Sequence, residues 1–151
     1  MNWPGKAREA GAPAPPVPLT PEQQKLYDTG QTLFNSLCMA CHGDDGKGRE
    51  KLGPSLIGSP FALAAPEVPI RILLQGKEGQ VGLMPPLGAT LTDEQIAGAL
   101  TYIRRQWGNA AGAVDPNAVK DVRAATAGRT RPWTNDELTA IGAGRGGQGA
   151  R

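Results

Sequence analysis

The sequence predicts an all-α fold with three core helices and a two-helix C-terminal extension. Helix-start signals, in which Thr is followed three residues later by Gln, occur at Thr20 and Thr92. Behind each signal, apolar residues recur at intervals of three and four, the spacing of one helix face. Gly and Pro, with 21 and 14 copies in 151 residues, supply breaks between these segments.

The first core helix is predicted to follow a linker. Residues 1–19 are rich in Pro and Ala, which favours an extended connector over packed structure. The helix should begin after Thr20, because Pro21 suits the first helical position and Gln23 completes a capping box. Gly30 would be costly in an exposed helix, so we expect a close crossing with another helix there. The predicted apolar face comprises Leu26, Gly30, Leu33, Phe34 and Leu37.

A second core helix is predicted from Pro66 or Glu67 to Gln75, since Gly76 follows as a stop signal. Its inward face comprises Val68, Ile72 and Leu73. The next stretch, GKEGQVGLMPPLGAT, is a Gly/Pro-rich loop that contains Met84. Its composition indicates that residues 76–90, here called the strap, cross over a flat group.

The third core helix is predicted to begin after Thr92 and to extend to Trp107. Arg104 and Arg105 lie near its end, where they would complement the negative end of the helix dipole. Its apolar face comprises Ile96, Ala99, Leu100, Ile103 and Trp107. Residues 20–107 are therefore predicted to form one domain.

Two further helices are predicted in an extension at residues 108–142. One begins at Asp115-Pro116, and the other begins at Trp133-Thr134 with Glu137 as its capping partner. The Gly-rich residues 143–151 are expected to form a disordered tail.

Composition and charge exclude several classes of protein. The length suits one ordinary domain with tails. Only 5% of the residues are aromatic, so a core built from protein atoms alone would be thin. The net charge of +2, with dispersed Lys and Arg, argues against nucleic acid as the main partner. No run approaches the roughly twenty apolar residues that a membrane span requires.

The stretch Cys38-Met39-Ala40-Cys41-His42, at the end of the first helix, matches the attachment signature of a c-type haem. Cys38 and Cys41 would each add to a haem vinyl group, and His42 would be the proximal iron ligand. A chance match, a redox-active pair and part of a zinc site are the alternatives. A thioredoxin-like pair belongs to a βαβ context, and no strand-like alternation lies nearby. Structural zinc needs four ligands, whereas the chain has two Cys and one His. One covalently bound haem is the favoured interpretation, and it would fill the thin core.

The second axial ligand of such a haem follows by elimination. Because His42 is the only His, two-His ligation within the chain is excluded. Met1 lies in the linker and Met39 within the attachment stretch, so Met84 remains. The alternative is that Met84 fills a gap in a core, but its Gly/Pro-rich flanks suit helix packing poorly.

Gly53-Pro54-Ser55-Leu56 is the informative part of the loop after His42. A metal-bound imidazole donates its other ring N–H to a carbonyl or carboxylate, and a Pro-fixed loop can hold a carbonyl still. A Pro54 that only rigidifies a turn is equally compatible with these residues.

Residues 20–107 resemble a class I c-type cytochrome. The resemblance is carried by Gly30, Phe34, Cys38-Met39-Ala40-Cys41-His42, Gly53-Pro54-Ser55-Leu56, Met84-Pro85-Pro86 and Tyr102. It implies a cytochrome c fold in which Gly30 and Phe34 cross Tyr102 of the last core helix. It also implies that the Pro54 carbonyl accepts a hydrogen bond from His42 and that Leu56 packs on the porphyrin. Position 99 departs from the family pattern, with Ala where a large aliphatic residue is usual.

The resemblance implies an electron carrier and not an enzyme. Ligation by His42 and Met84 would raise the reduction potential and leave no open iron position for a substrate. The alternative function is a haem enzyme or sensor, peroxidase-like or gas-binding, with a displaceable distal Met84. A structural or zinc-binding module is a third hypothesis.

The tail and the opening NWPGK resemble cytochrome modules at the C-terminus of larger exported bacterial dehydrogenases. The expected partners are therefore a dehydrogenase donor and a cytochrome or oxidase acceptor. The resemblance also implies that haem is attached outside the cytoplasmic membrane, in the periplasm or another extracytoplasmic compartment. Since residues 1–10 lack the apolar core of a secretory signal, we expect either a removed signal or a longer exported parent chain.

Overall fold

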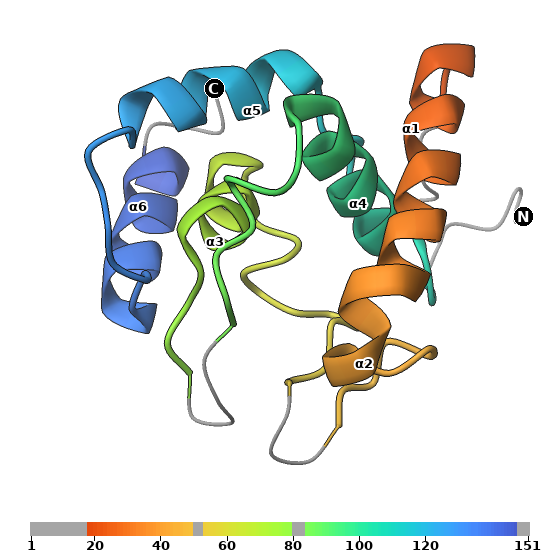
Figure 1. The fold of residues 1–151 in the computed structure, drawn as a ribbon, viewed down its shortest axis with the longest axis horizontal. Coiled ribbons are helices and arrows are strands. Elements are labelled where there is room, and N and C mark those ends of the chain that lie inside the picture. Colours follow the sequence, from red (N-terminus) through yellow and green to blue (C-terminus); the bar gives the residue numbers. More distant parts are fainter. Residues whose placement is uncertain (1–17, 50–52, 80–83, 148–151) are drawn as a thin grey trace, which may run out of the picture.

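The computed structural model describes residues 18–49, 53–79 and 84–147. Across these ranges the chain is helical and its only β-type pairings are isolated bridges, which confirms the all-α prediction. The helices are α1 (Pro21–Leu33), the π-helical turn η1 (Phe34–Cys38), α2 (Met39–His42), α3 (Glu67–Gln75), α4 (Asp93–Arg105), α5 (Pro116–Ala125) and α6 (Asn135–Gly147). Figure 1 shows α1 against α4 on one side, α6 on the other, and α3 between them.

Both capping boxes predicted for the core helices are present. The Gln23 amide donates to Thr20 Oγ1 at 3.2 Å, and the Thr20 amide donates to Gln23 Oε1 at 2.9 Å. Thr92 and Gln95 form the same pair at the start of α4. Each cap satisfies amides that have no partner within the helix, a contribution of about 1 kcal/mol.

α1 and α4 cross in direct backbone contact, as Gly30 led us to expect. A Cβ atom on Gly30 would lie 1.9 Å from the Gly98 carbonyl oxygen, and one on Gly98 would lie 2.7 Å from the Leu26 carbonyl oxygen. The backbone of Ala99, the position that departs from the family pattern, lies in the same contact. A crossing this close is possible only because neither helix carries a side chain at its centre.

The predicted apolar face of the first helix is wrong at Leu37, whose exposed fraction is 44%. Over Phe34–Cys38 the chain winds as a π-helix, in which the Met39 amide donates to the Phe34 carbonyl. This wider turn changes which residues face α4. Phe34 is fully buried, with its ring centroid 5.5 Å from that of Tyr102.

The sequence predicted that the third core helix extends to Trp107, but α4 ends at Arg105. Trp107 has a φ of 56°, a left-handed conformation that is uncommon for a bulky residue. Its ring packs against Phe34 at 5.1 Å between centroids, and a Cβ on Gly46 would lie 2.6 Å from the same ring. These contacts compensate for the strained backbone and fasten the loop after His42 to the end of α4.

The extension contains α5 and α6. At the start of α6, the Glu137 amide donates to Thr134 Oγ1 at 3.2 Å, and the Thr134 amide donates to Glu137 Oε1 at 3.0 Å. α6 continues to Gly147, so residues 143–147 are helical although the sequence predicted a disordered tail there. Residues 148–151 of the expected tail and residues 1–17 of the expected linker lie outside the described residues.

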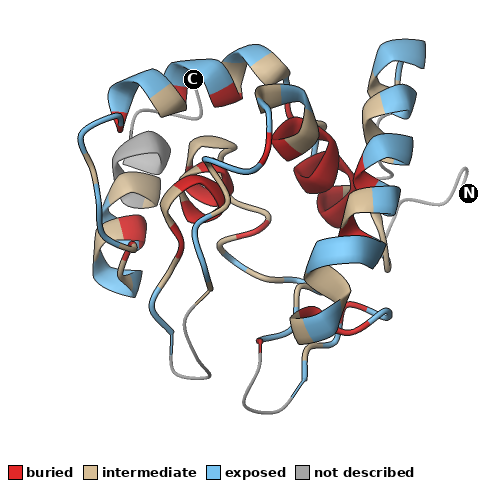
Figure 2. Cartoon of the chain, in the orientation of Figure 1, coloured by how far each residue is buried: buried red, intermediate tan, exposed pale blue. Residues whose placement is uncertain are grey.

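The buried residues form two clusters (Figure 2). The larger cluster joins α3 and α4 to the extension, and the smaller one surrounds Phe34 and Tyr102. Among the residues that the structure describes, no helix combines the length and the apolar character needed to cross a bilayer.

Replacing Gly30 with Ala should strongly destabilise the protein. Ala is favoured over Gly in a helix by about 1 kcal/mol, but the new methyl group would meet the Gly98 backbone, which cannot move independently of α4. We expect a net loss of about 3 kcal/mol or more in the free energy of unfolding of the holoprotein in guanidinium chloride. Gly128→Ala is the control, because its Cβ would meet nothing within 4 Å. Equal stability of the two variants would contradict the crossing.

Glu137 accepts hydrogen bonds from the Arg129 guanidinium, at 2.7 Å, and from the Thr134 amide. These contacts lower the pKa of Glu137 to about 2, with the hydrogen bond from Arg129 as the largest cause. Because the folded-state pKa lies below the ordinary value, the stabilisation is complete above about pH 5. It disappears as the pH falls toward 2.

Glu137→Gln should therefore lower the melting temperature at pH 7, and the difference from the wild-type protein should shrink between pH 5 and pH 2. Thermal unfolding followed by circular dichroism over this pH range measures both effects. Glu78→Gln, at an exposed position, is the charge control. A pH-independent difference between Glu137→Gln and the wild-type protein would rule out the ion pair as its cause.

Candidate haem site

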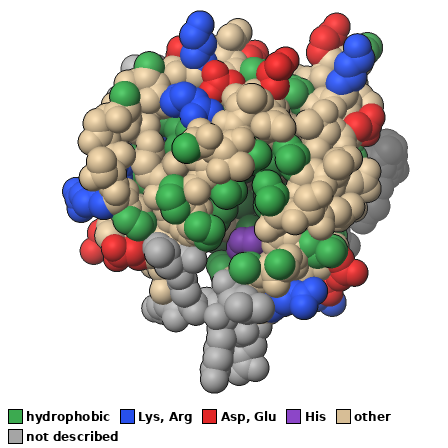
Figure 3. Space-filling model, in the orientation of Figure 1, with side chains coloured by type: hydrophobic (Ala, Val, Ile, Leu, Met, Phe, Trp, Pro, Cys, Tyr) green, Lys and Arg blue, Asp and Glu red, His purple; other side chains and the backbone are tan. Residues whose placement is uncertain are grey.

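A cavity of about 490 Å³ opens on one face of the molecule, between the loop after His42, α3 and the segment around Met84. Figure 3 shows this hollow lined by hydrophobic side chains, with an imidazole at its edge. Its apolar walls include Leu56, Phe61, Ile72, Leu73, Leu100 and Ile103. A cavity of this size and character is typical of a cofactor site.

Five of the six predicted site residues line this cavity: Cys38, His42, Pro54, Leu56 and Met84. Cys41 is half-buried in α2, directly before His42, and does not contribute to the lining. Residues far apart in the sequence are therefore brought together at one site.

His42 is the last residue of α2, and its side chain is buried. Its Nδ1 lies 2.8 Å from the carbonyl oxygen of Pro54. A carbonyl oxygen only accepts hydrogen bonds, so Nδ1 carries a proton, and in the neutral imidazole the lone pair is then on Nε2. The imidazole is thus held in the tautomer and orientation that a metal ligand needs.

The loop after His42 is held against α2 by its own backbone. The Gly48 amide donates to the His42 carbonyl at 2.7 Å, and the Leu56 amide donates to the Gly46 carbonyl at 2.7 Å. A Cβ on Gly53 would lie 2.8 Å from the Cys41 carbonyl oxygen, so this position requires Gly. These contacts fix the Pro54 carbonyl relative to the imidazole.

Two buried polar side chains, Asn109 and Arg104, bind backbone groups of the cavity wall, a role that the sequence did not indicate for either. Asn109 donates to the carbonyls of Leu56, at 3.1 Å, and Ile103, and it accepts from the Gly58 amide at 2.9 Å. No sequence motif marks Asn109, because its partners are Leu56 and Gly58, about fifty residues away.

Arg104 has a different role from the one that its position near a helix end suggested. It is 5% exposed and donates to the carbonyls of Ala62 at 3.0 Å, Ala64 at 2.6 Å and Gly112 at 2.8 Å. Burial lowers the pKa of its guanidinium. The sequence shows that Arg104 is a cation in the last turn of the helix. It does not show which carbonyls the side chain binds.

The environment of the thiols argues against a redox-active pair. Burial, with a smaller contribution from the neighbouring Cys41, raises the pKa of Cys38 to about 11. Reactive thiols in redox motifs have lowered pKa values, since the thiolate is the nucleophile. The Cys38 thiol is therefore protonated at neutral pH.

Met84 is half-buried and contributes to the cavity from the strap that follows α3. It also packs against the larger core cluster. Lys77 lines the same part of the cavity, with its Nζ 5.1 Å from the centre of the Phe61 ring, and burial lowers its pKa.

The residues present fit a c-type haem. The apolar walls suit a porphyrin, the free Nε2 of His42 and the thioether of Met84 are both donors that iron accepts, and Cys38 lies at the cavity edge. A helical fold around such a cavity, with the Cys-x-x-Cys-His signature, defines a c-type cytochrome.

Comparison with known families agrees with this class. Residues 25–103 match the family model described as cytochrome C oxidase, cbb3-type, subunit III, and the chain belongs to this family of c-type cytochrome domains. Family membership establishes covalently bound haem c, with its iron, as the cofactor.

Several curated proteins are similar to this chain. The fructose dehydrogenase cytochrome subunit of Gluconobacter japonicus is 37% identical over 106 residues, covering 63% of this chain and 22% of that protein. The gluconate 2-dehydrogenase cytochrome c subunit of Pantoea cypripedii is 34% identical over 92 residues, covering 55% and 21%. Cytochrome c-554(548) of Halomonas halodenitrificans is 35% identical over 69 residues, covering 46% and 83%.

This chain spans only about a fifth of the length of the first two relatives. The family and the relatives are cytochromes, either as separate carriers or as subunits of larger enzymes. The chain is therefore a cytochrome c domain with a role in electron transfer, which confirms the predicted class of function.

Proposed function

We propose that residues 20–107 carry one electron on a haem iron ligated by His42 and Met84, with Cys38 and Cys41 as the covalent tethers. The observation that carries the proposal is the 2.8 Å contact between His42 Nδ1 and the Pro54 carbonyl, inside a cavity that Met84 also lines. The bound haem supplies a metal centre that accepts and releases one electron.

The protein residues prepare this centre in three ways. The Pro54 carbonyl orients His42 and increases the electron density on its ring. Leu56 and the other apolar wall residues exclude water, which favours the less charged, reduced iron. Met84, as a soft thioether donor, favours ferrous iron in the same direction. The arrangement therefore suits a carrier of relatively high potential.

Relatives that are subunits of dehydrogenases support a redox partnership for this chain. We propose that it accepts electrons from an extracytoplasmic dehydrogenase and passes them to a cytochrome or oxidase. A donor fused upstream would be joined through the Pro-rich residues 1–19. A tether of this kind keeps donor and acceptor at a high effective concentration without a tight interface. Transient redox contacts are accordingly small and wet.

The tether assignment predicts that haem stays on the denatured chain. Both thiols should be consumed in attachment, so acid-organic extraction should leave the haem bound and a thiol reagent should detect no free Cys. Replacing both Cys38 and Cys41 with Ala should make the haem extractable. Extraction of haem from the wild-type chain would contradict the assignment of Cys38 and Cys41 as covalent tethers.

The ligand assignment is tested by Met84→Leu, which removes the sulfur but keeps a similar side-chain volume. We expect loss of the far-red sulfur-to-iron band, binding of carbon monoxide by the ferrous protein, and a potential lower by at least on the order of 0.1 V. Met39→Leu is the control and should keep all three wild-type properties. A band that persists in Met84→Leu would show that another group is the ligand. Rapid carbon monoxide binding by the wild-type protein would instead favour a haem enzyme or sensor.

A further inference from the structure

The C-terminal extension is bonded to the backbone on the N-terminal side of Met84. Lys77 and Met84 exchange two backbone hydrogen bonds, of 3.0 and 2.9 Å. On the other side of the same segment, the Glu78 amide donates to the Trp133 carbonyl at 2.9 Å, and the Trp133 amide donates to the Gly76 carbonyl at 3.0 Å. Residues 76–78 therefore lie between the ligand candidate and the loop that connects α5 to α6.

Trp133 is itself fixed by the extension and by α3. Its side chain is 8% exposed, and its Nε1 donates to Gln75 Oε1 at 2.9 Å. Gln75 in turn donates to Thr126 Oγ1 at 2.8 Å. The Arg129 guanidinium lies 3.5 Å from the centre of the indole ring. Movement of residues 76–78 would disturb this arrangement, because the hydrogen bonds of Trp133 and Gln75 in it are partly buried.

Arg123 of α5 holds the backbone on the C-terminal side of Met84. Its guanidinium donates to the carbonyls of Gly88 and Leu91, the latter at 2.9 Å, and pairs with Asp93 at 2.8 Å. The Gly88 amide also donates to the Leu74 carbonyl at 3.1 Å. Both ends of the strap are thus attached to the body of the protein, one through Trp133 and one through Arg123.

We propose that Trp133 and Arg123 are positioning residues for the distal iron ligand. By holding the backbone on both sides of Met84, they determine how readily its thioether leaves the iron. The proposal rests on the ligation by His42 and Met84 proposed above. An incoming small ligand can bind only after the thioether has moved away, so weaker anchoring should raise the rate of displacement.

The test uses the ferric full-length holoprotein and imidazole as the incoming ligand. Arg123→Gln removes the charged hydrogen bonds to Gly88 and Leu91 from a partly exposed position. We expect the rate of imidazole binding at saturating imidazole, measured by stopped flow through loss of the far-red band, to rise about tenfold. Trp133→Phe, which keeps an aromatic ring but loses the Nε1 donor, should raise the rate by a smaller factor.

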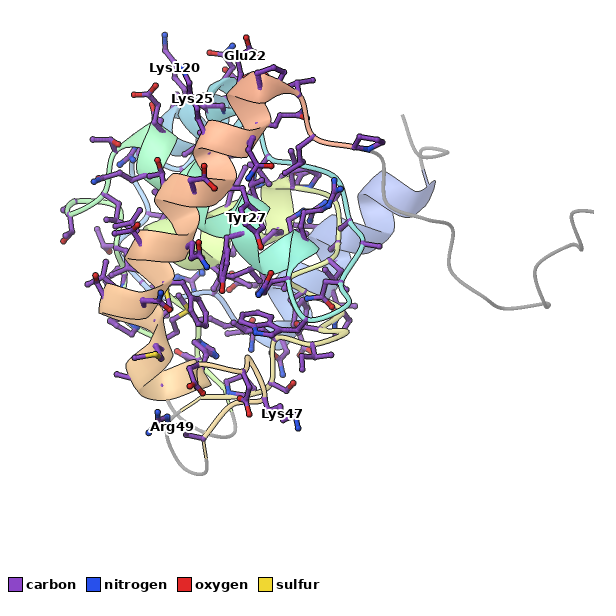
Figure 4. All side chains as sticks on the ribbon, turned by 90° about the vertical axis from the view of Figure 1, so that its right-hand side faces the viewer. Glu22, Lys25, Tyr27, Lys47, Arg49 and Lys120 are labelled. Carbon is purple, nitrogen blue, oxygen red and sulfur yellow. The ribbon has the colours of Figure 1, made fainter. Side chains whose placement is uncertain are left out.

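Lys120→Gln is the matched control, because it removes one positive charge from the same helix. Lys120 is exposed, and Figure 4 shows it at the opposite end of the molecule from Lys47 and Arg49 of the loop after His42. The rate of imidazole binding by Lys120→Gln should stay within about twofold of the wild-type rate. Global unfolding of each variant, followed by far-ultraviolet circular dichroism, separates local anchoring from general stability.

The outcomes distinguish this proposal from the ligand assignment on which it rests. If the wild-type protein shows the far-red band but Arg123→Gln and Trp133→Phe bind imidazole no faster than Lys120→Gln, the extension does not position Met84, even where melting temperatures fall. If the wild-type protein lacks the band, the ligation itself is wrong and the positioning role is lost with it. Should Arg123→Gln fail to fold, Trp133→Phe alone decides between these outcomes.

Discussion

The direct backbone contact between α1 and α4 is the constraint on which the haem site depends. With Gly30 against Gly98, the two helices approach closely enough for Phe34 to pack on Tyr102. The chain leaves this contact through a π-helical turn and ends in α2 with His42 at the cavity. A side chain at the crossing would separate the helices and move His42 away from Leu100 and Ile103, the residues of α4 that line the cavity.

A second constraint comes from the loops that form the cavity wall. These segments are rich in Gly and Pro and make few regular backbone pairings, so their carbonyls need other donors. Buried Arg104 and Asn109 supply several of them, from one helix and the turn that follows it. An unsatisfied buried carbonyl would cost about 1–3 kcal/mol, which makes these two side chains as important to the wall as its apolar residues.

Local rules allowed much of this structure to be predicted from the sequence. Thr20 and Thr92 begin helices because capping depends on neighbours three residues away, and Gly76 ends α3 for a similarly local reason. The haem attachment signature is likewise a short contiguous pattern. The errors at Leu37 and Trp107 have the opposite origin, since the π-helical turn and the left-handed Trp107 depend on packing between distant segments. The loop groups of the cavity wall that Arg104 and Asn109 bind lie about forty to fifty residues away, so the sequence near these two residues does not indicate that role.

The C-terminal extension contributes little to the cavity lining but supports the backbone around Met84. On the N-terminal side of Met84, its contacts with the strap are main-chain hydrogen bonds of Trp133, supported by the stacked Arg129 and the Arg129–Glu137 ion pair. Main-chain hydrogen bonds do not depend on which side chains the strap carries, so the sequence around Met84 does not predict them. Because residues 76–78 pair with Met84 on one edge and with Trp133 on the other, local opening of the extension removes support from one side of the strap. The stability of α5 and α6 is therefore coupled to the geometry of the cavity through the backbone.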